Sequence, residues 1–187
     1  MRFPLFIELA DRPCLVVGGG AVALRKAEAL ADYGARVIMV AGRARNGQDA
    51  RCPREEVSVV KRNFADGDVE GMTLVVAATD DPAVNRRVAD LCKAKGIPVN
   101  VVDDPANCTF VFPAIARKGP MTVAVSSGGA CPVAAKLVRD KAGRLLEDDF
   151  VAEVERLGCE REELKRRFPD PQTRRKHCEE VLEKWNG

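Results

Sequence analysis

The segment Val17-Gly18-Gly19-Gly20-Ala21-Val22-Ala23 decides the fold, because it joins a buried strand to a helix through three consecutive glycines. Residues 13–17 form a short apolar run, as in a strand that is covered on both faces. Residues 21–33 are apolar at helical spacing, and Gly34 is a natural C-terminal stop. The apolar run 36–41 then predicts a second strand, so the chain begins as strand, glycine turn, helix and strand.

The turn has the pattern G-x-G-x-x-A, which is typical of dinucleotide-binding sites. Gly18 permits the tight turn, Gly20 keeps the backbone accessible to a pyrophosphate, and the small Ala23 lets the helix pack close to the sheet. The helix N-terminus offers free N–H groups and a partial positive charge to phosphates. We therefore expect a dinucleotide to contact Gly18, Gly19, Gly20, Ala21 and Val22. The alternative is a glycine turn that only packs tightly.

The end of the second strand lacks the acidic residue that commonly holds the adenosine ribose. The chain reads Val40-Ala41-Gly42-Arg43-Ala44-Arg45 there, with no carboxylate. An arginine at this place can accept a 2′-phosphate, which would favour NADP. Arg43 and Arg45 are equally well explained as solvated loop residues, so the residues alone leave NAD and NADP open.

Strands and helices continue to alternate up to about residue 102. The runs 57–60, 74–78 and 98–102 predict further strands, and a helix is expected from Pro82 to Lys95. Thr79 and Asp80, just before that helix, are candidate cofactor neighbours as well as candidate capping residues. Repeated strand–helix units predict an α/β fold with a Rossmann-type parallel sheet and helices on both faces.

The pattern changes after Pro105. Residues 109–112 and 121–125 predict two strands in a hairpin, followed by a helix from Cys131-Pro132 to about Leu146. The rest of the chain predicts two helices, divided at Pro169-Asp170-Pro171. We therefore expect three parts, which are a dinucleotide-binding domain over 1–112, a small α+β region for dimerisation and substrate over 113–148, and a helical tail over 149–187.

Composition excludes several classes of protein. The net charge of +2 is too small to argue for nucleic acid binding, and no run approaches the ~20 apolar residues of a membrane span. Early acidic residues argue against a secretory signal at the N-terminus, so a cytoplasmic location is expected. The seven cysteines include no CxxC pair and are expected to be reduced thiols. The one histidine, His177, lies in a charged run and is expected to be solvated, so no resident metal site is predicted.

Four motifs in the same order carry a more specific signal than the turn alone. The turn, Ala78-Thr79-Asp80-Asp81, Asn100-Val101-Val102-Asp103 and Val125-Ser126-Ser127-Gly128-Gly129 together resemble the precorrin-2 dehydrogenase family, which includes the N-terminal half of siroheme synthase. The resemblance covers residues 1–148 closely and the tail loosely. It implies NAD-dependent oxidation of precorrin-2 to sirohydrochlorin, in some members Fe²⁺ insertion as well, and a homodimer with exchanged middle regions.

The resemblance also implies roles for single residues. The family's essential aspartate matches Asp103, its cofactor contacts match Ala21, Val22, Gly42 and Arg43, and a serine that carries phosphate in siroheme synthase matches Ser127. Gly42 departs from the family's proline, which leaves the adenosine contacts open. From the residues alone, Asp103 is explained equally by a turn with Asp104 and Pro105.

A tetrapyrrole substrate rich in carboxylates calls for basic partners. We expect substrate contacts from Asn100, Ser127, Arg117, Lys136 and Arg139, because arginine pairs well with carboxylates. A solvated helix face explains any one of the basic residues as well. The competing functions are a non-catalytic regulatory domain that senses NAD(H) and a catalytically inactive dimeric scaffold.

Overall fold

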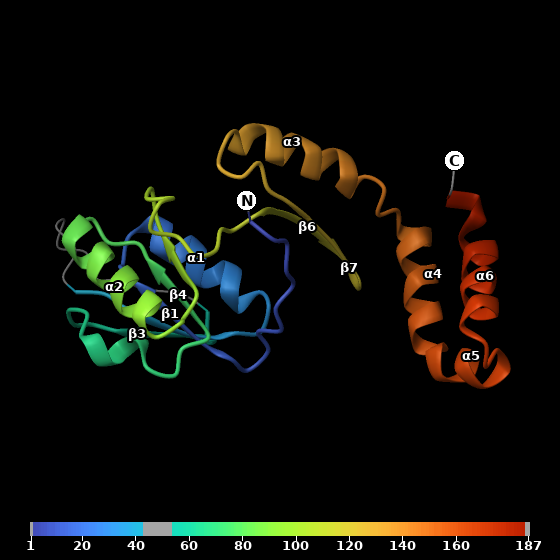
Figure 1. Ribbon diagram of the computed structural model, residues 1–187, viewed down its shortest axis with the longest axis horizontal. Helices are drawn as coiled ribbons and strands as arrows, with labels where there is room; N and C mark the ends of the chain where they lie inside the picture. The colour runs from blue at the N-terminus through green and yellow to red at the C-terminus, as the bar shows by residue number, and fades with distance from the viewer. Residues whose placement is uncertain (1, 43–53, 186–187) are drawn as a thin grey trace. The chain divides into compact units, whose positions relative to one another are not determined.

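The computed structural model describes residues 2–42 and 54–185 (Figure 1). It divides into two compact units, Met1–Phe112 and Pro113–Gly187, which are described separately. No helix within the described residues is long and apolar enough to cross a bilayer.

The first unit contains a five-stranded parallel sheet with the order β3-β2-β1-β4-β5. Its strands are β1 (Pro13–Val17), β2 (Arg36–Val40), β3 (Val57–Val60), β4 (Leu74–Ala77) and β5 (Val99–Val101). The described helices of this unit are α1 (Ala21–Ala31), α2 (Pro82–Ala94) and the short η1 (Asp66–Val69). The predicted Rossmann-type α/β fold is confirmed, and β1 and β3 have the expected bounds.

Side chains of the central strands alternate between two apolar layers. Cys14 and Val16 of β1 pack with α1 on one face of the sheet. Leu15 and Val17 pack with α2 and η1 on the other face. All four are at most 2% exposed, which explains why this strand reads as a continuous apolar run. The two layers hold the sheet rigid, so the carboxyl ends of its strands form a fixed edge.

The second unit begins with an antiparallel hairpin of β6 (Ala114–Lys118) and β7 (Met121–Val125). Helix α3 (Pro132–Gly143) packs against this hairpin. The remaining elements are α4 (Asp148–Cys159), α5 (Arg161–Arg167), α6 (Pro171–Leu182) and η2 (Glu183–Trp185). Phe150 of α4 contacts Trp185 edge-on, with ring centroids 5.5 Å apart, so aromatic packing joins α4 to the end of the described chain.

Two expectations about elements are wrong. Residues 109–112 do not form a strand: neither sheet of the described residues includes them, and Phe110 and Phe112 pack half-buried against the core beside α1. The partner of β7 is instead β6, five residues further along. The described part of the tail contains three α-helices and not two, because α4 ends at Cys159 and α5 begins at Arg161.

Candidate functional site

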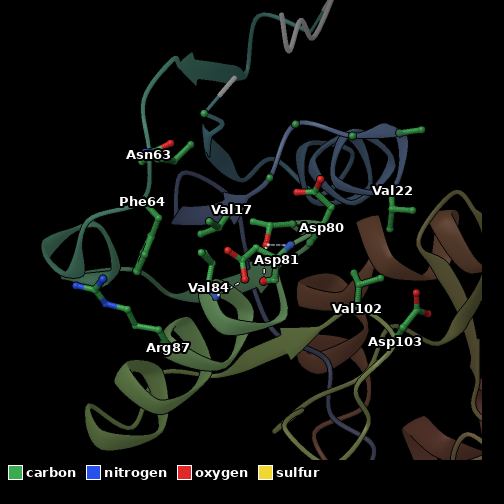
Figure 2. A pocket seen from close by; sticks show the side chains of 18 residues that line it. Val17, Val22, Asn63, Phe64, Asp80, Asp81, Val84, Arg87, Val102 and Asp103 are labelled. Atoms are coloured by element: carbon green, nitrogen blue, oxygen red, sulfur yellow. Dashed lines mark hydrogen bonds between the residues drawn. The ribbon is translucent and has the colours of Figure 1, made fainter. Parts of the chain in front are cut away.

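A cleft of about 920 Å³ lies over the carboxyl ends of the parallel strands in the first unit (Figure 2). It extends from Asn63 and Phe64, which follow β3, to Val102 and Asp103, which follow β5. The glycine turn after β1 lies between these two ends. Ligands of open α/β sheets bind at this edge, and the volume suits a cofactor-sized molecule.

The turn has the backbone geometry that a bound pyrophosphate requires. Gly18 has a φ of +128°, and a Cβ there would overlap the carbonyl oxygen of Ala78 at the end of β4. Gly20 is the N-cap of α1, with a φ of −80°, and a Cβ there would meet nothing within 4 Å. Gly18 is therefore needed for packing, whereas the missing side chain of Gly20 keeps the cleft open.

The first turn of α1 has no side-chain cap among the residues that the structure describes. Helix N-termini leave several N–H groups without partners inside the helix, and they carry a partial positive charge. Both features favour an anion, and the open space beside Gly20 gives it access to Ala21 and Val22. The residues therefore fit the pyrophosphate of a dinucleotide.

The segment after β4 lies beside the turn, since Gly18 packs against Ala78. Its capping and cofactor-facing roles fall on different residues. Asp81 caps α2, since its carboxylate accepts the N–H of Ala83 at 2.8 Å. Thr79 is fixed by Asn85, whose Oδ1 accepts the threonine hydroxyl at 2.7 Å. Thr79 and Asp80 both line the cleft, as expected. The capping role predicted for these two residues belongs to the next residue.

Asp103 lies at the end of the cleft beyond β5 and has a left-handed backbone, with a φ of +59°. This conformation is uncommon for residues other than glycine, although aspartate and asparagine adopt it more readily than most. The following turn is held by Cys108, whose thiol accepts the N–H of Val101 at 3.1 Å and donates to the carbonyl of Asp104 at 3.2 Å. Asp103 thus lines the cleft from a backbone conformation that carries a local energetic cost.

The neighbouring carboxyl group has a different role. The side chain of Asn107 donates to Asp104 at 2.7 Å, and this bond holds the pKa of Asp104 below its ordinary value. The carboxylate of Asp104 is thus used in hydrogen bonds within the turn. Of the two aspartates, only Asp103 lines the cleft.

Nine residues that line the cleft were not predicted as site residues. Five of them lie in segments that the sequence had already singled out (Val17, Val40, Ala78, Asp81 and Val102), and the other four do not. Asn63, Phe64, Val84 and Arg87 come from the segment after β3 and from α2. Arg87 forms an ion pair of 2.7 Å with Asp66 in η1, and the bond holds the pKa of Asp66 below its ordinary value. Their place after a strand or in the first turns of the next helix is the signal that would have suggested them.

The other predicted site residues lie outside this cleft. Asn100 is 8% exposed and donates to the Phe110 carbonyl at 3.1 Å, so its amide holds the 108–110 segment. Ser127, Arg117, Lys136 and Arg139 belong to the second unit. Ser127 accepts the N–H of Cys131 at 3.0 Å, and Arg139 pairs with Asp140. Arg43, a predicted cofactor contact, lies outside the described residues, as does Arg45.

His177 is only partly solvated. It is half-buried, and its ring lies 5.0 Å from that of Phe168, centroid to centroid. His177 lies on α6 and Phe168 at the C-terminal end of α5, so this contact makes His177 a packing residue of the tail.

Comparison with known proteins supports this assignment of the cleft. A family described as NAD(P)-binding matches residues 5–114, which contain the sheet, the glycine turn and Asp103. A solved structure of SirC, precorrin-2 dehydrogenase, superposes with a TM-score of 0.74 over 97% of this chain and 89% of that chain, at 21% identity. At this identity, the likeness concerns the fold, which it confirms.

Two curated relatives are siroheme synthases. The chain is 44% identical over 185 residues to "Siroheme synthase" of Ectopseudomonas mendocina (strain ymp), which covers 98% of this chain and 39% of the relative. It is 41% identical over 188 residues to the protein of the same name from Thioalkalivibrio sulfidiphilus (strain HL-EbGR7), and the match covers 97% of this chain and 37% of that relative. The chain thus spans about two fifths of the length of these relatives.

The resemblance inferred from the four motifs is confirmed by these matches, and so is NAD(P) as the cofactor class. The matched family covers more than half of the chain, including every described residue of the glycine turn. This chain belongs to the NAD(P)-binding family whose sequence profile spans its residues 5–114.

Proposed function

We propose that this chain oxidises precorrin-2 to sirohydrochlorin with NAD⁺, as a step of siroheme biosynthesis. One observation carries the proposal: the glycine turn and Asp103 line the same cleft in a chain that is 41–44% identical to siroheme synthases. The turn supplies a dinucleotide site, and Asp103 supplies a carboxylate at the other side of the central strands.

When bound, the nicotinamide ring is the acceptor for the hydride that leaves the substrate. The chain's own residues orient the cofactor and manage the accompanying proton. The backbone N–H groups after Gly20 bind the pyrophosphate, and the wall from Ala78 to Asp80 confines the dinucleotide to the sheet edge. The carboxylate of Asp103 accepts the proton that the substrate loses together with the hydride.

The substrate contacts of the second unit are part of this proposal. Precorrin-2 is a polycarboxylate, and Arg117, Lys136 and Arg139 supply guanidinium and ammonium groups of matching charge. Arg139 already donates to the Ile115 carbonyl at 3.3 Å, so β6 holds its guanidinium in place. Ser127, in the turn between β7 and α3, is a further proposed substrate contact, and its hydroxyl accepts the N–H of Cys131.

We assign the active form to a homodimer in the cytoplasm. Helix α3 exposes Val133, Leu137 and Val138 at 75%, 56% and 51%, and Leu145 just after it at 72%. Exposed apolar side chains gathered on one element mark an interaction surface. Light scattering of the purified chain at two concentrations tests this assignment, and a monomer at both would remove it.

The decisive experiment mixes the purified chain with precorrin-2 and NAD⁺ and follows the absorbance of sirohydrochlorin. Turnover supports the dehydrogenase. NAD⁺ binding without turnover would instead identify a sensing domain or an inactive scaffold, and the proposal would fail. An anaerobic assay with sirohydrochlorin and Fe²⁺ then tests iron insertion, which we include in the proposal as a second activity of the same site.

A further inference from the structure

The end of β2 lacks a group that most dinucleotide sites of this fold possess. An acidic side chain there normally accepts a hydrogen bond from the 2′-hydroxyl of the adenosine ribose. In this chain, β2 ends at Val40 and continues through Ala41 to Gly42, which has no side chain. Among the described residues, the end of β2 therefore offers the ribose no side-chain acceptor.

Asn63 occupies the place that the missing side chain would take. It follows β3, which pairs in parallel with β2, so both strands end at the same edge of the sheet. A Cβ built on Gly42 would overlap the Oδ1 atom of Asn63 and lie 3.5 Å from its Cγ atom. The amide of Asn63 is therefore positioned directly over the end of β2, and it lines the cleft (Figure 2).

The backbone of Asn63 is held in place, whereas its side chain is available to a ligand. Arg62 donates to the Asn63 carbonyl at 3.0 Å and grips both carboxylate oxygens of Asp68, at 2.6 and 2.7 Å. The side-chain amide of Asn63 is exposed and makes no hydrogen bond to any residue that the structure describes. Because the backbone is already held, only the side-chain rotamer has to be ordered when the amide binds a ligand.

We infer that Asn63 is the specificity-determining residue of the cofactor site, and that its amide oxygen accepts the 2′-hydroxyl of the adenosine ribose in place of the usual carboxylate. The inference rests on NAD(P) binding and not on the tetrapyrrole reaction. An amide is neutral, so it accepts a hydrogen bond from the 2′-hydroxyl of NAD⁺ but does not repel the 2′-phosphate of NADP⁺ as a carboxylate would. The wild-type chain should therefore prefer NAD⁺ only modestly.

The test is a binding cycle measured by isothermal titration calorimetry, with no turnover required. The wild-type chain should bind NAD⁺ about five-fold more tightly than 2′-deoxy-NAD⁺, the worth of one neutral hydrogen bond. Asn63→Ala should bind NAD⁺ about five-fold more weakly than the wild type and should not distinguish the two ligands. Asn63→Asp should keep NAD⁺ affinity and weaken NADP⁺ at least about ten-fold. Gln172→Ala, an amide truncation on α6, is the control.

The outcomes separate this inference from the rest of the account. The inference is supported if Asn63→Ala binds NAD⁺ and 2′-deoxy-NAD⁺ equally well, while the wild type and the control still prefer NAD⁺. Undiminished discrimination in Asn63→Ala overturns it, even if the wild type binds NAD⁺ well and oxidises precorrin-2. A wild-type chain that binds neither NAD⁺ nor NADP⁺ would overturn the cofactor assignment itself, together with this inference.

Discussion

The backbone of Gly18 lies directly against the carbonyl group of Ala78, so that a Cβ on residue 18 would be 2.7 Å from the carbonyl carbon. This contact brings the end of β1 against the end of β4 and sets the start of α1. Because Gly18 also has a φ of +128°, two separate constraints exclude a side chain at this position. The geometry of the cofactor site thus depends on packing between backbones.

Gly18→Ala should destabilise the first unit by about 2–4 kcal/mol, since it adds both a steric overlap and an unfavourable φ. Urea unfolding measures the change. Gly71→Ala is the matched control, because Gly71 has a φ of +72° but nothing within 4 Å of its would-be Cβ. The control should lose only about 1 kcal/mol. Equal losses in the two variants would show that the contact with Ala78 is not required.

Gly20→Ala should separate binding from stability. A Cβ at this position enters open space in the cleft, so the free energy of unfolding should fall by no more than about 1 kcal/mol. The affinity for NAD⁺ should fall about ten-fold or more, because the methyl group lies where the pyrophosphate approaches the backbone. Calorimetric titration with NAD⁺ checks this, and an unchanged dissociation constant would place the pyrophosphate elsewhere.

Asp103 should be needed for turnover and not for cofactor binding. Asp103→Ala should lower the rate of precorrin-2 oxidation about 100-fold or more, with NAD⁺ affinity unchanged. Asp103→Gly should be equally inactive but about 1 kcal/mol more stable than Asp103→Ala, because glycine adopts the φ of +59° without cost. An alanine variant with full activity would end the proposed role of this carboxylate.

The ion pair between Arg62 and Asp68 predicts that the stability of the fold depends on pH. The Arg62 guanidinium, with the N–H of Ala65, holds the pKa of Asp68 below its ordinary value. A lowered pKa in the folded state stabilises the fold above the ordinary value near 4, and the contribution is lost as the pH falls through the lowered pKa. Asp68→Asn should therefore cost about 1 kcal/mol above pH 5. The difference from the wild type should shrink toward zero in acid.

Thermal unfolding of the two proteins at pH 7 and at pH 3 tests this sign. Asp32 provides a control, because it also pairs with an arginine, Arg54, but its side chain is 60% exposed. Asp32→Asn should change stability little at either pH. A cost of Asp68→Asn that is the same at both pH values would contradict a carboxylate held in its charged form.

Local patterns predicted most of the first unit, because its strands are mainly apolar runs between polar or glycine boundaries. The turn from Gly18 to Gly20 was readable for the same reason, since its chemistry is local. Thr109–Phe112 misled the prediction because an apolar run that fills a core looks the same as one that pairs in a sheet. The two cases differ in whether the run has a partner strand, and that depends on tertiary structure: β7 pairs with β6 and not with 109–112.

Asn63 shows the limit for the site. Nothing in its own neighbourhood marks it as a ligand, because its role depends on which strand lies beside β3 and on the missing side chain of Gly42. Asn100 shows the opposite limit. It belongs to the motif that carries the family resemblance, yet its amide is bonded to the Phe110 carbonyl within the fold.

The central claim is that a nicotinamide dinucleotide binds with its pyrophosphate on the backbone after Gly20. A crystal structure of the chain soaked with NAD⁺ tests it most directly. The account predicts phosphate oxygens within hydrogen-bonding distance of the N–H groups of Ala21 and Val22, and the nicotinamide toward Asp103. A dinucleotide bound at any other edge of the sheet, with this turn blocked by a side chain, would contradict it.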